Sequence, residues 1–175
     1  MRSALRKAGR LDNAIYAAVA STRIPLLDRA MRRLSRTADH GKLWLAVAVG
    51  LGLLGGDAGR RAGRRGLVSL GIASASANLI LKPLARRHRP EREEEEIPSS
   101  RNVPLPRSSS FPSGHTASAF AFAVGAGAEM PALKWPLRTL AAAVGYSRVH
   151  TGAHYPGDVA AGALVGIAAG RFSGH

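Results

Sequence analysis

The sequence predicts an all-α protein: a membrane-embedded helical bundle of about five core helices, with one or two amphipathic helices at its N-terminus. Three observations favour this class. Five apolar segments follow one another along the chain, Ala, Gly, Leu and Val supply most of the apolar mass, and Arg and Lys gather outside those segments. Small side chains let helices approach closely, as they do in transmembrane bundles. At 175 residues the chain is long enough for one compact domain.

Residues 1–40 are expected to form a basic N-terminal region of two short amphipathic helices, broken near Arg23–Pro25. Their apolar stripes consist of Leu5, Leu11, Ile15 and Val19 in the first helix, and Leu26, Leu27, Ala30, Met31 and Leu34 in the second. A basic amphipathic helix commonly lies in the headgroup region of a membrane. The alternative is a solvated helix that packs on the rest of the domain.

Residues 41–175 are expected to form a single helical domain. Its apolar segments are Leu43–Leu54, Leu67–Leu81, Ala117–Ala128, Leu137–Val144 and Val159–Ala169. Each is shorter than the roughly 20 residues of an ideal spanning helix, and flanking small polar residues extend most of them to about 16–20. The arginine-rich segment 60–65 is interpreted as a short basic loop, and the Pro- and Ser-rich connection 83–112 as a mobile loop.

The composition excludes several classes of function. A formal charge of +14 suits either nucleic acid or an anionic membrane, but no nucleic-acid recognition motif is present and the basic runs flank apolar segments, which favours the membrane. Without cysteine there is neither a disulfide nor a thiolate metal site. The acidic residues Glu91 and Glu93–Glu96 are interpreted as a solvated face and not as a metal site. Asp12 and Asn13 interrupt any signal-peptide core, so no cleavable signal is predicted.

Polar clusters stand at the ends of the apolar segments. Residues 82–90 close the second segment, residues 111–115 open the third, and residues 146–158 run from the end of the fourth to the start of the fifth. If consecutive helices alternate in direction, all three clusters meet on one face of the bundle. The order of the segments therefore predicts a single composite site.

The residue types in these clusters suit phosphoryl transfer. Three cations can neutralise a phosphoryl group, and arginine offers a planar fork for bidentate contact. Residues 113–115 would begin a helix, where free backbone N–H groups attract an anion and a glycine lets the backbone approach it. An imidazole with a carboxylate four residues on has the base and orienter of a catalytic triad. The cations are Lys82, Arg89 and Arg148, the imidazoles are His115 and His154, and the carboxylate is Asp158.

These residues together resemble the complete tripartite motif of the type 2 phosphatidic acid phosphatase superfamily. The motif is Lys82 with six residues before Arg89-Pro90, then Pro112-Ser113-Gly114-His115, then Ser147-Arg148 with five residues before His154 and three before Asp158. No signature position departs from the pattern, and the resemblance covers roughly residues 40–172. The stretch from Asp39 to Trp44 also resembles actinobacterial members of the superfamily.

The resemblance implies a helical bundle with its site at one end, a phosphohistidine intermediate, and neither a metal nor another cofactor. By the resemblance, His154 is the nucleophile, Asp158 its orienter and His115 the acid for the leaving group. The residues implied to bind phosphate are Lys82, Arg89, Ser113, Gly114 and Arg148. His150 matches no motif position and is predicted to be structural or supporting, and His88 is predicted to face solvent.

The expected activity is hydrolysis of a lipid phosphate or pyrophosphate of the cell envelope. Candidate substrates are polyprenyl phosphates and pyrophosphates, a polyprenyl-phosphoryl sugar phosphate, phosphatidic acid and phosphatidylglycerol phosphate. Two alternatives stay open here. A vanadium haloperoxidase would share the anion cradle, and a non-enzymatic lipid-phosphate binding protein would be expected to lack a catalytic residue.

The chain is expected to be a multi-pass protein of the cell membrane, but two charge patterns disagree on its orientation. The basic segment 60–65 lies opposite the expected site and favours a cytoplasmic position for that side. The basic N-terminus lies on the side of the site and argues the reverse. Between the two, we favour a site that faces outward.

Overall fold

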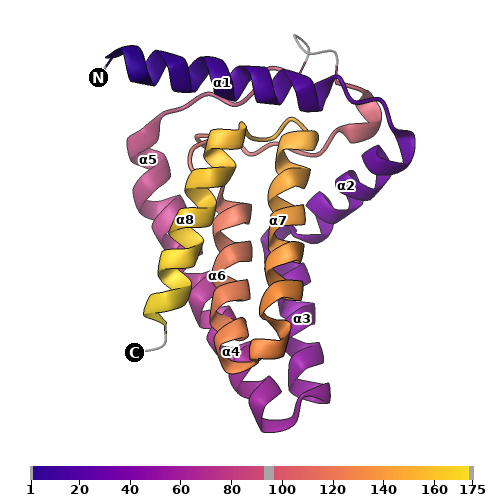
Figure 1. The fold of residues 1–175 in the computed structure, drawn as a ribbon, viewed down its shortest axis with the longest axis vertical. Coiled ribbons are helices and arrows are strands. Elements are labelled where there is room, and N and C mark those ends of the chain that lie inside the picture. Colours follow the sequence, from indigo (N-terminus) through magenta and orange to yellow (C-terminus); the bar gives the residue numbers. More distant parts are fainter. Residues whose placement is uncertain (1, 93–96, 174–175) are drawn as a thin grey trace.

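The computed structural model describes residues 2–92 and 97–173, and the regular structure in this part of the chain is helical (Figure 1). The longer helices are α1 (Arg2–Ala20), α2 (Pro25–Thr37), α3 (Lys42–Leu54), α4 (Gly56–Ala75), α6 (Gly114–Glu129), α7 (Lys134–His150) and α8 (Pro156–Phe172). The shorter pieces are η1 (Asp39–Gly41), the π-helical η2 (Ser76–Leu81), α5 (Lys82–Ala85), η3 (Ser99–Arg101) and η4 (Pro131–Leu133). The predicted all-α bundle is confirmed.

Helix α6 forms the centre of the bundle. It packs against α4, α7 and α8, while α3 packs on α4. The buried face of α6 consists mostly of alanine and glycine around Phe122. Glycines on the neighbouring helices make room for it: a Cβ on Gly66 of α4 would lie 2.7 Å from the Phe122 ring, and one on Gly166 of α8 would lie 2.3 Å from the Ala117 carbonyl oxygen. The small residues therefore set how closely these helices approach.

The arginine-rich segment 60–65 is not the loop that its charge suggested. It forms part of α4, which begins at Gly56. A Cβ on Gly59 would come within 1.9 Å of the Leu51 carbonyl oxygen of α3, and one on Gly63 within 2.9 Å of the Ala48 carbonyl oxygen. The glycines, spaced four residues apart, give this stretch a packing face, and the arginines lie on the rest of the helix surface.

The two N-terminal helices pack on the bundle with polar residues inward. Helix α1 lies across one end of the bundle, and α2 contacts α7 (Figure 1). On α1, Asp12 and Tyr16 are buried, whereas Leu11 and Ile15 of the predicted apolar stripe are 62% and 43% exposed. The break between the helices, at 21–24, falls where the sequence predicted it. These two residues of the apolar stripe thus face away from the protein.

The connection between α5 and α6 is anchored in its described part, in contrast to the mobile loop predicted from its composition. Arg101 in η3 is fully buried, and its Nε donates to an Asp28 carboxylate oxygen of α2 at 2.8 Å. Nearer α6, the Ser110 hydroxyl donates to the His88 carbonyl oxygen at 2.9 Å. A buried ion pair fixes this segment. The proline and serine content of the segment does not indicate such a contact. Residues Glu93–Glu96 lie outside the described residues.

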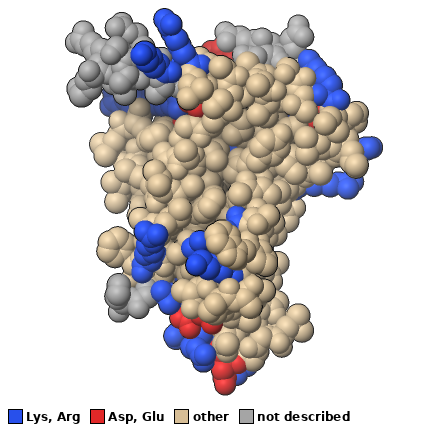
Figure 2. Space-filling model, viewed as in Figure 1, with Lys and Arg blue, Asp and Glu red and all other residues tan. Residues whose placement is uncertain are grey.

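The outer surface carries apolar side chains that a water-soluble bundle would bury. Leu53, Leu79 and Leu164 are 78%, 76% and 69% exposed. Within the described residues, one helical stretch, Gly56–Ala85, is long and apolar enough to cross a membrane by length and composition. On the face shown in Figure 2, Lys and Arg lie at the upper end, on the right-hand flank and over the lower half of the molecule.

Candidate active site

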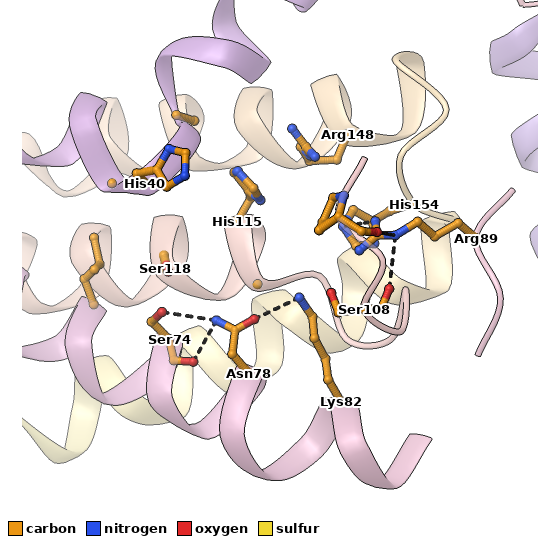
Figure 3. Close-up of a pocket in the computed structure, with 15 residues that line it drawn as sticks. His40, Ser74, Asn78, Lys82, Arg89, Ser108, His115, Ser118, Arg148 and His154 are labelled. Carbon is orange, nitrogen blue, oxygen red and sulfur yellow. Dashed lines mark hydrogen bonds between the residues drawn. The ribbon is translucent and has the colours of Figure 1, made fainter. Parts of the chain in front are cut away.

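A cavity of about 390 Å³ lies between η1, the α4–α5 stretch, α6 and the end of α7. Six of the predicted site residues line it: Lys82, Arg89, Gly114, His115, Arg148 and His154 (Figure 3). Segments far apart in the sequence thus meet at one end of the bundle, as the order of the apolar segments predicted. Ser113 and Asp158 are not in the lining and are fully buried.

His154 lies in the short loop between α7 and α8, and only 2% of it is exposed. Its Nε2 is 3.3 Å from Nη1 of Arg89, and its Nδ1 is 3.5 Å from Oδ2 of Asp158. Burial lowers the pKa of His154 to about 4, and the nearby Arg148 and Arg89 act in the same direction, against the raising effect of Asp158. The imidazole is therefore neutral near pH 7, the form that can act as a nucleophile.

Asp158 is held by two hydrogen-bond donors at the start of α8. Pro156 begins that helix, and Asp158 accepts a hydrogen bond from the Tyr155 backbone N–H at 3.0 Å in a capping box. Its other carboxylate oxygen accepts from Nη1 of Arg87 at 2.8 Å. The side chain that faces His154 is thus held by a backbone donor and a guanidinium at once.

The start of α6 carries the motif residues 113–115. Ser113 is the N-cap of the helix, and its buried hydroxyl accepts hydrogen bonds from the backbone N–H and the hydroxyl of Thr116, at 3.4 and 3.0 Å. The Ser113 side chain therefore caps the helix, and the phosphate contact predicted for it stays a prediction. A Cβ on Gly114 would lie 3.2 Å from Asn78 Oδ1 and 3.5 Å from Lys82 Nζ, so glycine keeps this wall of the cavity open.

Three cations converge on the cavity from different elements (Figure 3). Lys82 donates from Nζ to Oδ1 of Asn78, one helical turn earlier, at 2.8 Å. Arg89 donates to the Ala153 carbonyl oxygen at 2.8 Å, beside the loop of His154. Arg148 of α7 is almost fully buried, and its Nη1 donates to the Ser35 hydroxyl of α2. Such a set can neutralise a small, highly charged anion.

Comparison with known proteins identifies the family. The profile of the PAP2 superfamily matches residues 65–174. The chain is 36% identical over 173 residues to a decaprenylphosphoryl-5-phosphoribose phosphatase of Mycobacterium tuberculosis, covering 94% of this chain and 89% of that protein. It is 34% identical over 139 residues to the protein of that name from Mycolicibacterium smegmatis, covering 75% and 68%. This chain belongs to the PAP2 superfamily.

Two solved structures have the same fold. Aquifex aeolicus LpxE superimposes with a TM-score of 0.76 at 26% identity, covering 93% of this chain and 94% of that one. A PAP2 type phosphatidylglycerolphosphate phosphatase from Bacillus subtilis superimposes with a TM-score of 0.71 at 24% identity, covering 96% of this chain and 85% of that one. The family predicted from the tripartite motif is confirmed, and with it the class of enzyme, a phosphatase that acts on lipid phosphates.

Several polar contacts of this PAP2 site involve residues that the motif does not contain. Asp39 of η1 lies 2.8 Å from Nε2 of His115, and Asp12 of α1 forms an ion pair with Arg87. The only hint in the sequence was the resemblance of residues 39–44 to actinobacterial proteins.

Within the described residues, no cluster of three or more His, Asp and Glu is placed to hold a metal ion.

Two histidines outside the motif, His150 and His88, lie apart from the cavity, whereas His40 lines it. His150 is fully buried in α7, and its Nε2 is 2.8 Å from Oδ1 of Asp28. It links α7 to α2, which is the structural role predicted for it. His88 is exposed, as predicted.

Proposed function

We propose that this chain removes the terminal phosphate from a lipid-linked phosphomonoester, and that a polyprenyl-phosphoryl sugar phosphate is its substrate. The observation that carries the proposal is the placing of a neutral imidazole, His154, beside three cations in one cavity. The relatives named decaprenylphosphoryl-5-phosphoribose phosphatase support the choice of lipid. Phosphatidic acid and phosphatidylglycerol phosphate, which carry a phosphomonoester on a different lipid, are the substrates to compare.

The roles we assign follow two balanced steps. In the first, Nε2 of His154 bonds to phosphorus, the bond from phosphorus to the lipid oxygen breaks, and His115 gives its proton to that oxygen. In the second, a water oxygen bonds to phosphorus, the phosphorus–nitrogen bond breaks, and the water proton passes to His115. Both histidines are thereby restored, and inorganic phosphate leaves.

The charged groups support each step. Lys82, Arg89 and Arg148 would balance the phosphoryl oxygens, whose charge a divalent metal neutralises in other phosphatases. Asp158 would stabilise the cationic ring of phosphorylated His154 and hold its tautomer, as in catalytic triads. The free N–H groups of Gly114 and His115, at the start of α6, would donate to phosphate.

We further propose that the protein is a multi-pass membrane protein with its site facing outward. The exposed leucines on α3, η2 and α8 support burial of these helices in lipid. The arginines of segment 60–65 lie at the α3–α4 end, opposite the cavity, and support a cytoplasmic position for that end. Residues 1–40 would lie along the outer surface, with the bundle of residues 41–175 as the single catalytic domain.

The test is a substrate panel with the purified protein in detergent. Released phosphate is measured for a polyprenyl-phosphoryl ribose phosphate, phosphatidic acid, phosphatidylglycerol phosphate and a polyprenyl pyrophosphate, with His154→Ala as the control. We expect the sugar phosphate to give the highest kcat/KM and His154→Ala to release nothing above background. A higher kcat/KM for a glycerophospholipid would refute the substrate, and equal release by His154→Ala would refute the mechanism.

A further inference from the structure

Three aspartates in the basic N-terminal region all turn toward the bundle. Residues 1–56 contain only Asp12, Asp28 and Asp39 as acidic residues. Asp12 pairs with Arg87, Asp28 pairs with Arg101 and His150, and Asp39 pairs with His115. The profile of the family begins at residue 65, so it assigns nothing to these carboxylates. Of the three, only Asp39 contacts a side chain that lines the cavity and takes part directly in the proposed chemistry.

We propose that Asp39 is the positioning residue of the leaving-group acid, so that the site contains a second carboxylate–imidazole pair beside Asp158–His154. Oδ1 of Asp39 lies 2.8 Å from Nε2 of His115. The same oxygen is 3.7 Å from Nη1 of Arg148. This inference rests on the proposed function, because it requires His115 to give a proton to the lipid oxygen.

The turn that carries Asp39 is built to hold it in place. His40 and Gly41 both have positive φ, 56° and 73°, and they line the cavity together with Ala38, whereas Asp39 is not in the lining. Just beyond the turn, Trp44 is buried against Phe122 of α6 at a ring distance of 5.1 Å. The turn is therefore anchored on the helix that carries His115, and the carboxylate approaches the imidazole from outside the substrate space.

The charges around His115 explain why an acid needs this partner. Burial of the ring disfavours an imidazolium at His115, and so do the cations Arg148 from α7 and Lys82 from α5. His40, on the same turn as Asp39, is the other titratable group near the pair. Asp39 is the carboxylate that opposes these cations. The hydrogen bond from His115 lowers the pKa of Asp39, so its carboxylate stays ionised and can stabilise the protonated ring.

The pairing also assigns the proton that moves. An ionised carboxylate only accepts hydrogen bonds, so Nε2 of His115 carries the hydrogen that points at Asp39. The proton passed to the lipid oxygen, and later recovered from water, is then the one on Nδ1. Asp39 keeps its charge throughout the cycle and never touches the substrate.

The experiment compares two leaving groups in Asp39→Asn. A lipid alkoxide needs the acid and p-nitrophenolate does not, so we expect kcat/KM to fall about 10²-fold on the lipid substrate and about threefold or less on p-nitrophenyl phosphate. The double variant with His115→Ala should have the same kcat/KM on the lipid as His115→Ala alone, within about threefold, because the two residues act as one unit. Asp39→Glu, which keeps the charge, should recover part of the activity on the lipid.

Asp28→Asn is the matched control, since Asp28 also holds a buried histidine at 2.8 Å but lies off the cavity. We expect it to lower kcat/KM on both substrates by the same factor. In the double variant with His115→Ala, the two fold-losses should multiply. If Asp39→Asn behaves like this control, the proposal is overturned, and Asp39 acts through the fold or through phosphate binding by Arg148. An inactive wild type would instead refute the proposed function.

A measurement on the wild type covers the case in which Asp39→Asn fails to fold. ¹⁵N NMR of histidine in detergent, with His115→Ala for assignment, reports which ring nitrogen carries the hydrogen. We expect neutral His115 to be protonated at Nε2. A neutral ring protonated at Nδ1 would contradict the pairing.

Discussion

The role of Asp158 can be tested by removing its charge and little else. In Asp158→Asn an amide oxygen in the place of Oδ2 can still accept from the Tyr155 N–H and face His154, and the amide nitrogen then takes the place of Oδ1 and faces Arg87. The negative charge beside Arg87, and beside the ring of His154 that becomes cationic on phosphorylation, is lost. The substitution therefore keeps the helix cap and removes the stabilisation of the phosphorylated ring.

The size of the effect follows from the 3.5 Å between His154 Nδ1 and Asp158 Oδ2, because a charged pair at that distance is worth roughly 5 kcal/mol at an effective dielectric constant of about 20. Arg87 already engages the other carboxylate oxygen and offsets part of this attraction. We expect kcat/KM to fall about 10³-fold, which corresponds to roughly 4 kcal/mol in the barrier.

The assay is kcat/KM on one lipid substrate, after thermal melting in detergent has shown that each variant is folded. Asp28→Asn supplies the contrast, because Asp28 holds the buried Arg101 and His150 away from the cavity. Breaking that buried network costs about 3–5 kcal/mol of stability and lowers Tm. We expect His150→Ala to cost about tenfold or less in activity. If Asp158→Asn kept near-full activity while His150→Ala lost all of it, the nucleophile would have to be reassigned.

Three further outcomes are expected. His115→Ala should lose about 10²–10⁴-fold on the lipid but retain slow phosphorylation by p-nitrophenyl phosphate; equal losses on both would contradict its role as acid. Activity should survive excess EDTA and be inhibited by orthovanadate, and a loss restored by Mg²⁺ would refute metal-independent chemistry. Because burial lowers the pKa of His154 to about 4, its ring should stay neutral as pH falls through 6.5 and protonate only near pH 4. Histidine NMR, assigned with His154→Ala, checks this, and a midpoint near 6.5 would refute it.

The sequence was sufficient for the bundle and for the position of the site. Each core helix begins or ends close to an apolar segment, and the order of the segments alone placed residues 82–90, 111–115 and 146–158 on one face. Contacts between near neighbours could also be predicted from the sequence, because Pro156 starts α8 and puts Asp158 in the first turn, within reach of His154. These features depend on neighbours in the sequence or on simple alternation of direction.

The failures have a common physical origin in contacts between distant segments. Segment 60–65 was assigned to a loop because of its arginines, although its glycines pack on α3. Arg101 was assigned to a mobile connection, although Asp28, 73 residues away in the sequence, fixes it. None of these partners can be found by periodicity or composition.

The N-terminal helices show that the apolar stripe of an amphipathic helix need not be the face that packs on the protein. In water an apolar stripe packs inward, but on α1 Leu11 and Ile15 are exposed while Asp12 and Tyr16 are buried. The bundle end beneath α1 is polar and cationic, so it is complemented by a carboxylate and not by leucine, as the ion pair of Asp12 with Arg87 demonstrates. Leu11 and Ile15 are left on the outer face, where the proposed membrane arrangement would place lipid. In a helix that covers a charged active site, the few acidic residues identify the face that packs on the protein.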